Sequence, residues 1–194
     1  MFPYNHKKGQ TIQTDVSGKN TDRAFLSHVS LGSPAAASNT AGHADVTLAD
    51  GAITEVMTGI TNPDVPRALR VKGNAVGIAG NVVIDGTNEL DEAITETIIA
   101  ADTGAVEGNK AFKTVTKITF PARTTAGDKI SVGYNDKLGL PYKLATNTVL
   151  MAALNHVKEA TAPTVTVSAT AIESNTIDLN SALNGDPVEA WLMV

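Results

Sequence analysis

Beyond residue 43 the chain alternates between short apolar segments and polar turns rich in Gly, Asn, Asp and Pro. The clearest period of two lies at residues 113–120, where the apolar positions shift by one between Val115 and Ile118, which predicts a β-bulge. Strands at a spacing of roughly 8–12 residues, without long helical patterns between them, are typical of β-sandwiches and barrels. We therefore expect an all-β body, a β-sandwich or β-barrel-like arrangement of short antiparallel strands. Further strands are expected at residues 46–48, 53–56, 68–72, 76–78, 81–84, 92–99, 128–133, 163–168 and 188–194.

Three segments of this body carry more specific expectations. The dipeptide Asp50-Gly51 is typical of a hairpin turn. The alternation in residues 92–99 places Ile94, Glu96 and Ile98 on one side of a strand. Residues 147–159 allow two interpretations, because their apolar spacing fits an amphipathic helix and also two strands around a turn at residues 155–156; Thr and Val at its start favour strands.

The first 42 residues follow a different pattern. They are polar except for a short apolar island around Phe25, Leu26 and Val29, and residues 32–42 consist of small residues, as in a linker. A segment of this kind buries too little apolar surface to fold alone, so it either stays mobile or is ordered by a partner, and the apolar island favours docking on a partner. We expect an extended N-terminal arm and linker at residues 1–42 and a β-rich body at residues 43–194. The candidate assembly contacts are Phe25, Leu26, Val29 and Trp191, the tryptophan of the terminal strand.

The composition narrows the class of partner. The chain has 194 residues, 42% of them hydrophobic and only 4% aromatic. We expect one domain, with or without a long arm, whose core is built from Val, Ile, Leu and Ala. The net charge of -5 comes without a Lys/Arg cluster, so nucleic acid is not expected as a direct partner. Cysteine is absent, which excludes disulfides and thiolate chemistry. Neither a signal peptide nor an apolar run long enough to span a membrane is expected.

Candidate chemistry is sparse. The histidines His6, His28, His43 and His156 are scattered without the spacing of metal ligands, and no Gly-x-Ser-x-Gly motif marks a nucleophile. The Gly-rich run at residues 73–80 lacks the Gly-Lys-Ser/Thr ending of a phosphate loop. Acidic residues gather at residues 85–96, but they do not match a calcium loop and fit a solvated hairpin tip. We expect no catalytic residues, no cofactor and no metal site, hence no enzyme.

Six segments of the body resemble a family of small virion structural proteins of tailed bacteriophages and prophages. The resemblance covers residues from about 45 to 194 and leaves the first forty unmatched. The segments are residues 60–67 (ITNPDVPR), 77–88 (GIAGNVVIDGTN), 92–96 (EAITE), 108–118 (GNKAFKTVTKI), 137–142 (KLGLPY) and 175–185 (NTIDLNSALNG).

The resemblance implies a β-rich particle component without catalytic activity, located in the virion and assembled in the cytoplasm of the host bacterium. It implies as partners the major capsid protein or other virion proteins, with copies of the chain forming a homo-oligomer. A head-decoration protein bound to the shell through its body and arm is the first hypothesis. A tail-tube or head–tail completion protein is the alternative, and a glycan- or host-binding module on the virion surface is a second alternative.

Overall fold

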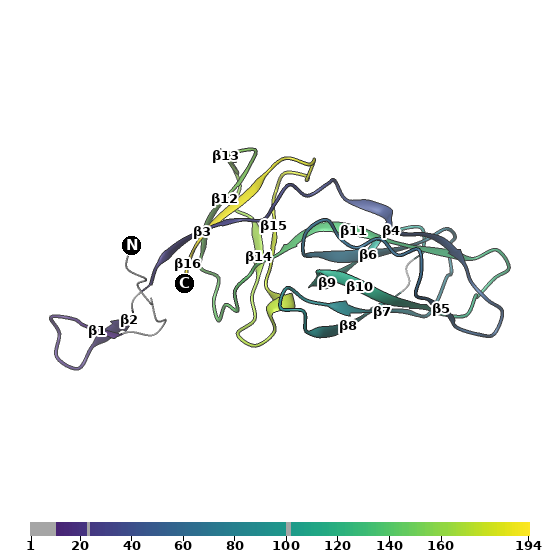
Figure 1. The fold of residues 1–194 in the computed structure, drawn as a ribbon, viewed down its shortest axis with the longest axis horizontal. Coiled ribbons are helices and arrows are strands. Elements are labelled where there is room, and N and C mark those ends of the chain that lie inside the picture. The colour runs from purple at the N-terminus through teal and green to yellow at the C-terminus, as the bar shows by residue number, and fades with distance from the viewer. Residues whose placement is uncertain (1–10, 23, 100–101) are drawn as a thin grey trace.

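Two hydrophobic cores, joined by one long strand, organise the chain (Figure 1). The computed structural model describes residues 11–22, 24–99 and 102–194. Every strand pair in these residues is antiparallel, and the fold is all-β, as expected. The elements are β1 (Thr11–Gln13), β2 (Asn20–Asp22), β3 (Leu26–Ser30), β4 (Ser38–Thr47), β5 (Thr54–Val56), β6 (Arg67–Gly73), β7 (Asn81–Thr87), β8 (Ala93–Ile99), β9 (Val106–Phe112), β10 (Thr114–Phe120), β11 (Lys129–Gly139), β12 (Val149–Leu154), β13 (Val157–Lys158), β14 (Thr164–Thr166), the 3₁₀ helix η1 (Ile172–Ser174), β15 (Thr176–Asp178) and β16 (Val188–Met193).

The first core lies inside a sandwich of two sheets. One sheet has the order β5-β10-β7-β8, and the other has the order β14-β15-β11-β6-β9 with β4 also paired to β11. Alternation decides which side chains enter the core: on β8, Ile94, Glu96 and Ile98 face inward, as the sequence predicts. The register between β10 and β7 shifts between Val115 and Lys117, which confirms the predicted bulge.

The second core lies at the other end of the molecule, under the terminal sheet of order β13-β12-β16-β3 (Figure 1). Inward-facing residues of β16 pack there against the end of β11 and the chain that follows it. Those buried side chains include Val188, Ala190 and Leu192 from β16 and Leu138 and Leu140 from β11 and its extension. β3 and β16 are far apart in the sequence but pair as antiparallel neighbours in this sheet.

One strand, β11, contributes to both cores. Ile130 and Val132 belong to the first core and Leu138 to the second. Near its middle, β4 lies unusually close, because a Cβ atom at Gly133 would overlap the carbonyl group of Ser38. Glycine is therefore required here for close approach of two backbones rather than for a special dihedral angle.

The buried side chain of Arg67 lies where the two cores meet. It is 0% exposed, and its Nε donates a hydrogen bond to the Asn135 carbonyl at 2.8 Å. Its Nη1 donates to the Ala35 carbonyl at 2.9 Å and to Asp64 Oδ1 at 3.1 Å. A fully buried guanidinium is stable only with such a complete set of partners.

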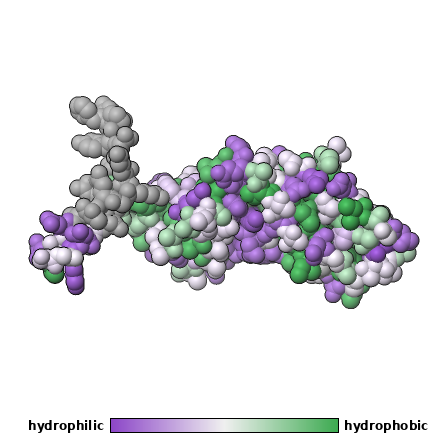
Figure 2. Space-filling view, turned by 90° about the horizontal axis from the view of Figure 1, so that it is seen from below, coloured by the Kyte–Doolittle hydropathy of each residue, from purple (hydrophilic) through white to green (hydrophobic). Residues whose placement is uncertain are grey.

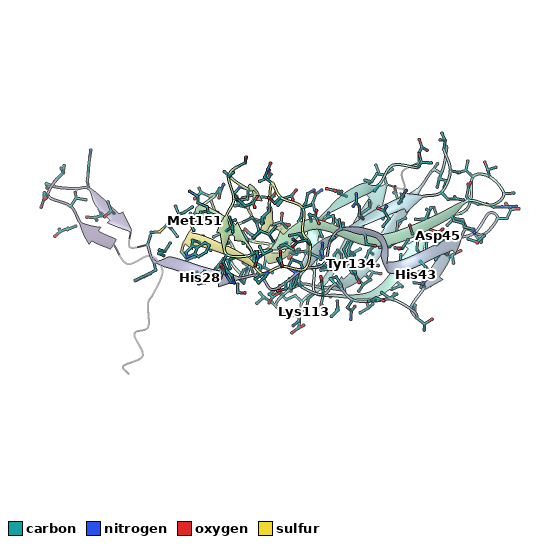
Figure 3. All side chains as sticks on the ribbon, turned by 90° about the horizontal axis from the view of Figure 1, so that it is seen from above. His28, His43, Asp45, Lys113, Tyr134 and Met151 are labelled. Atoms are coloured by element: carbon teal, nitrogen blue, oxygen red, sulfur yellow. The ribbon has the colours of Figure 1, made fainter. Side chains whose placement is uncertain are left out.

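Tyr134 supports this junction from the side of the first core. The Arg67 guanidinium lies 5.6 Å from the centre of the Tyr134 ring, a cation–π distance. The Tyr134 hydroxyl lies 2.8 Å from the carbonyls of Thr61 and Asn62, and its burial raises the pKa of this hydroxyl to about 12. Through this hydroxyl, Tyr134 in the middle of β11 holds the loop before β6 in place (Figure 3).

The structure corrects the expected division of the chain at residue 42. β4 runs from Ser38 to Thr47 and crosses that boundary, and β3 pairs with β16. Residues 24–42 are thus part of the body, ordered by their own chain rather than by an external partner. Within residues 32–42, Pro34 and Gly42 are buried and β4 begins at Ser38, so this segment is not a free linker. Residues 1–10 and 23 of the expected arm lie outside the described residues, and residues 11–22 form the hairpin of β1 and β2, apart from both cores (Figure 1).

Three local expectations have mixed outcomes. Residues 147–159 form the hairpin β12–β13, with positive φ at Asn155 (52°) and His156 (61°), so strands are confirmed and the helix is excluded. Asp50-Gly51 turns the chain with a φ of 63° at Gly51, but it connects strands of different sheets rather than a hairpin. The strand expected at residues 76–78 is wrong, because residues 74–80 form the loop that carries the chain from one layer of the sandwich to the other.

We expect Arg67→Met to lower the free energy of unfolding by about 3–5 kcal/mol, because it leaves buried acceptors at Asn135 and Ala35 without a donor. Urea unfolding followed by fluorescence of Trp191, the only tryptophan, measures this loss. The matched control is Arg123→Met, whose guanidinium pairs with the exposed Asp50 and should leave the midpoint nearly unchanged. If the two substitutions lowered the free energy of unfolding equally, Arg67 would not be the residue that stabilises the contact between the two cores.

Candidate functional site on the terminal sheet

The outer face of the terminal sheet brings together residues from both ends of the chain. Because inward positions on β16 alternate with outward ones, Glu189, Trp191 and Met193 face away from the second core. The pairing of β16 with β3 sets Ser30 opposite Glu189, His28 opposite Trp191 and Leu26 opposite Met193. On the other side of β16, Met151 of β12 lies opposite Trp191.

Trp191 lies at the centre of this face. The His28 imidazole stacks on its indole with ring centroids 4.5 Å apart and planes inclined by 13°. This is a cross-strand aromatic pair, the arrangement that stabilises neighbouring strands beyond simple burial. His28 and Met151 both lie in the part of the body nearest the β1–β2 hairpin (Figure 3).

Glu189 lies between two histidines. Its Oε1 is 3.3 Å from His28 Nε2, and its Oε2 is 3.2 Å from His156 Nδ1. The left-handed turn at residues 155–156 brings His156 to this position at the end of the β12–β13 hairpin. One carboxylate thus links β3, β16 and the β12–β13 turn on the outer surface.

Exposed aliphatic side chains complete the face. Leu26 and Leu150 are each 62% exposed. Leu150 is turned outward by a register shift between Val149 and Met151, which inserts an extra residue into β12. Figure 2 shows hydrophobic surface at this end of the body. An apolar face with a single stacked tryptophan is typical of a surface that contacts another molecule.

The four candidate assembly contacts meet in this sheet but have different surroundings. Leu26 is exposed, Trp191 is partly covered by His28, and Val29 packs against the second core. Phe25 exchanges backbone hydrogen bonds of 2.8 and 2.9 Å with Val194. Leu26 and Trp191 are therefore the two that form the outer face. The sequence did not point to Glu189, Met151 or His156, because only strand pairing brings them together.

Several polar groups away from the terminal sheet are engaged in contacts within the fold. In the expected hairpin tip, Thr95 donates a hydrogen bond to Asp85, which lowers the pKa of this carboxyl, and Lys113 pairs with Asp91 at 2.8 Å. His43 Nδ1 lies 2.8 Å from the Ala44 carbonyl. Among the described residues no group of three or more His, Asp or Glu side chains is arranged to hold a metal ion.

Two recesses lie elsewhere on the body. The larger, about 460 Å³, is polar and is lined by Asn39, Asp45, Lys72 and Asn74 among others. The smaller, about 230 Å³, lies beside the end of β3 and is lined by Ser30, Leu31, Val65 and Pro66 among others. The smaller recess therefore adjoins the terminal sheet.

No protein-family model, curated protein or solved structure matches this chain. The candidate site is therefore defined by the geometry of the described residues alone. Within residues 11–22, 24–99 and 102–194, no helix is long and apolar enough to cross a membrane.

A buried carboxylate at the open side of the sandwich is the clearest source of pH dependence. Glu96 of β8 is 8% exposed, and its Oε1 accepts hydrogen bonds from the backbone N–H groups of Asn109 at 2.6 Å and Lys110 at 3.3 Å. Burial raises the pKa of Glu96 above its ordinary value of 4.5, although these N–H donors oppose the shift. The folded state therefore binds this proton more tightly than the unfolded state.

We expect the contribution of Glu96 to stability to fall as pH rises from about 4.5 through its folded pKa, and to stay constant above it. In Glu96→Gln the side-chain carbonyl can still accept from Asn109 and Lys110, but the titration is gone. The difference in unfolding free energy between the two proteins should thus shift in favour of the variant as pH rises through this window. Urea titrations at several pH values measure it, and parallel curves would contradict the assignment.

Proposed function

We propose that this chain is a non-enzymatic structural protein of a tailed-phage particle, a decoration protein that binds the head shell. The observation that carries the proposal is the apolar outer face of the terminal sheet, with Trp191 at its centre and Leu26 and Leu150 around it. The resemblance of residues 45–194 to phage virion proteins supports the choice of particle. The partners would be the major capsid protein and further copies of the chain.

The composition of the face supports protein contact. Tryptophan and methionine are enriched at the centres of protein interfaces, and Trp191 here lies opposite Met151 and beneath His28. Its charged groups are Glu189, held by two histidines, and Lys158, which the register of β13 places on the same face at its edge. A partner surface that covers Trp191 and Leu26 could leave the exposed Lys158 in water.

The N-terminal hairpin supports a second contact. β1 and β2 pair over only three residues and lie apart from both cores (Figure 1). A two-stranded hairpin is at best marginally stable in water on its own, so contact with a neighbour would stabilise it. Many weak contacts of this kind become strong together when repeated over a symmetric shell.

A tail-tube or completion protein is the second candidate, because one sheet has an outer face suited to lining a channel. On the β5-β10-β7-β8 sheet, Lys117 lies 3.5 Å from Glu55 and 3.2 Å from Asp85, and Thr95 continues this polar row. Rings or tubes formed by the purified protein alone would favour this candidate.

Deletion of residues 1–22 should leave a folded body that binds heads less tightly, because it removes the hairpin and spares β3 and β4. Deletion of residues 1–42 is unsuitable, since it would remove β3 and half of β4. Co-sedimentation with empty heads of the phage that encodes the chain measures binding, with the full chain as reference. Unchanged head binding by the truncated protein would eliminate the role of the hairpin. Gold-labelled full-length protein found on tails, or on neither part of the particle, would contradict head decoration.

A further inference from the structure

The open strand edges of this fold are not equally protected. Natural sheets protect edges by keeping them short, charged or covered, because an open edge pairs readily with another strand. β5 and β14 have three residues each and β13 has two. β8 and β9 face one another, and the Glu96 carboxylate of β8 accepts from the N–H groups of Asn109 and Lys110 on β9.

β4 has ten residues and pairs only with β11, but two register shifts interrupt that pairing, the strand carries Asp45, and the Gly42 carbonyl accepts a hydrogen bond from Thr61 N–H. β3 has none of these protections. It has five residues, Leu-Ser-His-Val-Ser, without Lys, Arg, Asp, Glu or Pro, and it is the last strand of the terminal sheet. Phe25 and Leu31 form backbone hydrogen bonds with β16 and the residue after it, so Ser27 and Val29 also face β16 in the antiparallel pattern. The N–H and C=O groups of Leu26, His28 and Ser30 therefore point away from β16, and no other described strand pairs with them.

We propose that β3 pairs with β3 of a second copy of this chain, antiparallel and centred on His28. A two-fold axis at His28 sets Leu26 of each copy opposite Ser30 of the other. Leu26, His28 and Ser30 would then exchange their free backbone groups across the axis. The two terminal sheets would join into one continuous sheet, with both apolar outer faces on the same side.

Charge favours a second copy as the occupant. A two-fold contact places identical residues near the axis, so charged residues there would repel one another. The only ionisable side chain of β3 is His28, and the Glu189 carboxylate of its own copy lies 3.3 Å away. Leu26 of the second copy would lie next to Ser30, at the rim of the 230 Å³ recess lined by Leu31, Val65 and Pro66.

The size of the contact sets its strength. A stable dimer buries about 1,600 Å² in total, and one pair of five-residue strands buries less than that. The isolated dimer should therefore be weak and reversible. This inference extends the proposed assembly role but rests on the geometry of the edge, so its test in solution is separate from binding to phage heads.

Two double variants that differ only in the sign of the charge at residue 26 test the register. L26K/S30K places lysines opposite each other at both ends of the strand pair, whereas L26E/S30K places a glutamate opposite a lysine at each end. In both variants the lysine at position 30 lies next to Glu189 of its own copy. Position 26 lies beside the uncharged Met193, so the two variants should have similar stability as folded monomers. Val76→Lys, on an exposed loop of the first core, is the surface control.

Sedimentation equilibrium of the full chain over micromolar to millimolar concentrations gives the dimer dissociation constants. We expect L26K/S30K to dimerise at least about tenfold more weakly than the wild type, and L26E/S30K to match or exceed it. The same self-association for both double variants, or a wild type that stays monomeric throughout, would overturn the proposal. Circular dichroism confirms that each variant is folded.

Amide hydrogen exchange gives a readout that needs no substitution. As the wild-type concentration rises, the amides of Leu26, His28 and Ser30 should become protected, whereas those of Ser27 and Val29 are protected throughout by β16. Dimerisation without this alternating gain would place the contact elsewhere and overturn the proposal. Dimerisation with the gain, but without head binding, would uphold it and count against the decoration role alone.

Discussion

The buried guanidinium of Arg67 is the interaction on which the relation between the two cores depends. A charge removed from water is tolerated only when hydrogen bonds replace its hydration, and here the replacements come from three separate segments of chain. The Asn135 carbonyl belongs to β11, the Ala35 carbonyl to the segment between β3 and β4, and Asp64 to the loop before β6. The position of each segment therefore constrains the others, and with them the entry of the chain into the terminal sheet.

Much of the first core could be predicted because its information is local. The alternation around Glu96 and the bulge after Val115 follow from residue type and spacing, and so does the turn at residues 155–156 in the terminal sheet. The division at residue 42 could not be predicted in this way, because glycine and alanine are common both in linkers and where backbones lie close together. Only the partner strand distinguishes these cases, as the close approach of Ser38 to Gly133 shows.

The candidate site was predictable in part for the same reason. Leu26 and Trp191 stand out in the sequence as apolar residues near the chain ends. Glu189 and His156 do not stand out, because they are brought together only by pairing between segments that are far apart in the sequence. A histidine interpreted as isolated is in fact stacked on the tryptophan, which no spacing rule within one strand would reveal. Surfaces made of paired chain ends are therefore harder to recognise from sequence than sites within one loop.

The pairing of β3 with β16 also sets the order of events during synthesis. Residues 26–30 leave the ribosome well before their partner strand at residues 188–193. Contacts between such distant segments form slowly, because the intervening chain has to be ordered first. The second core and the outer face of its sheet can therefore close only after β16 has been synthesised. A nascent chain that ends before β16 would lack this surface.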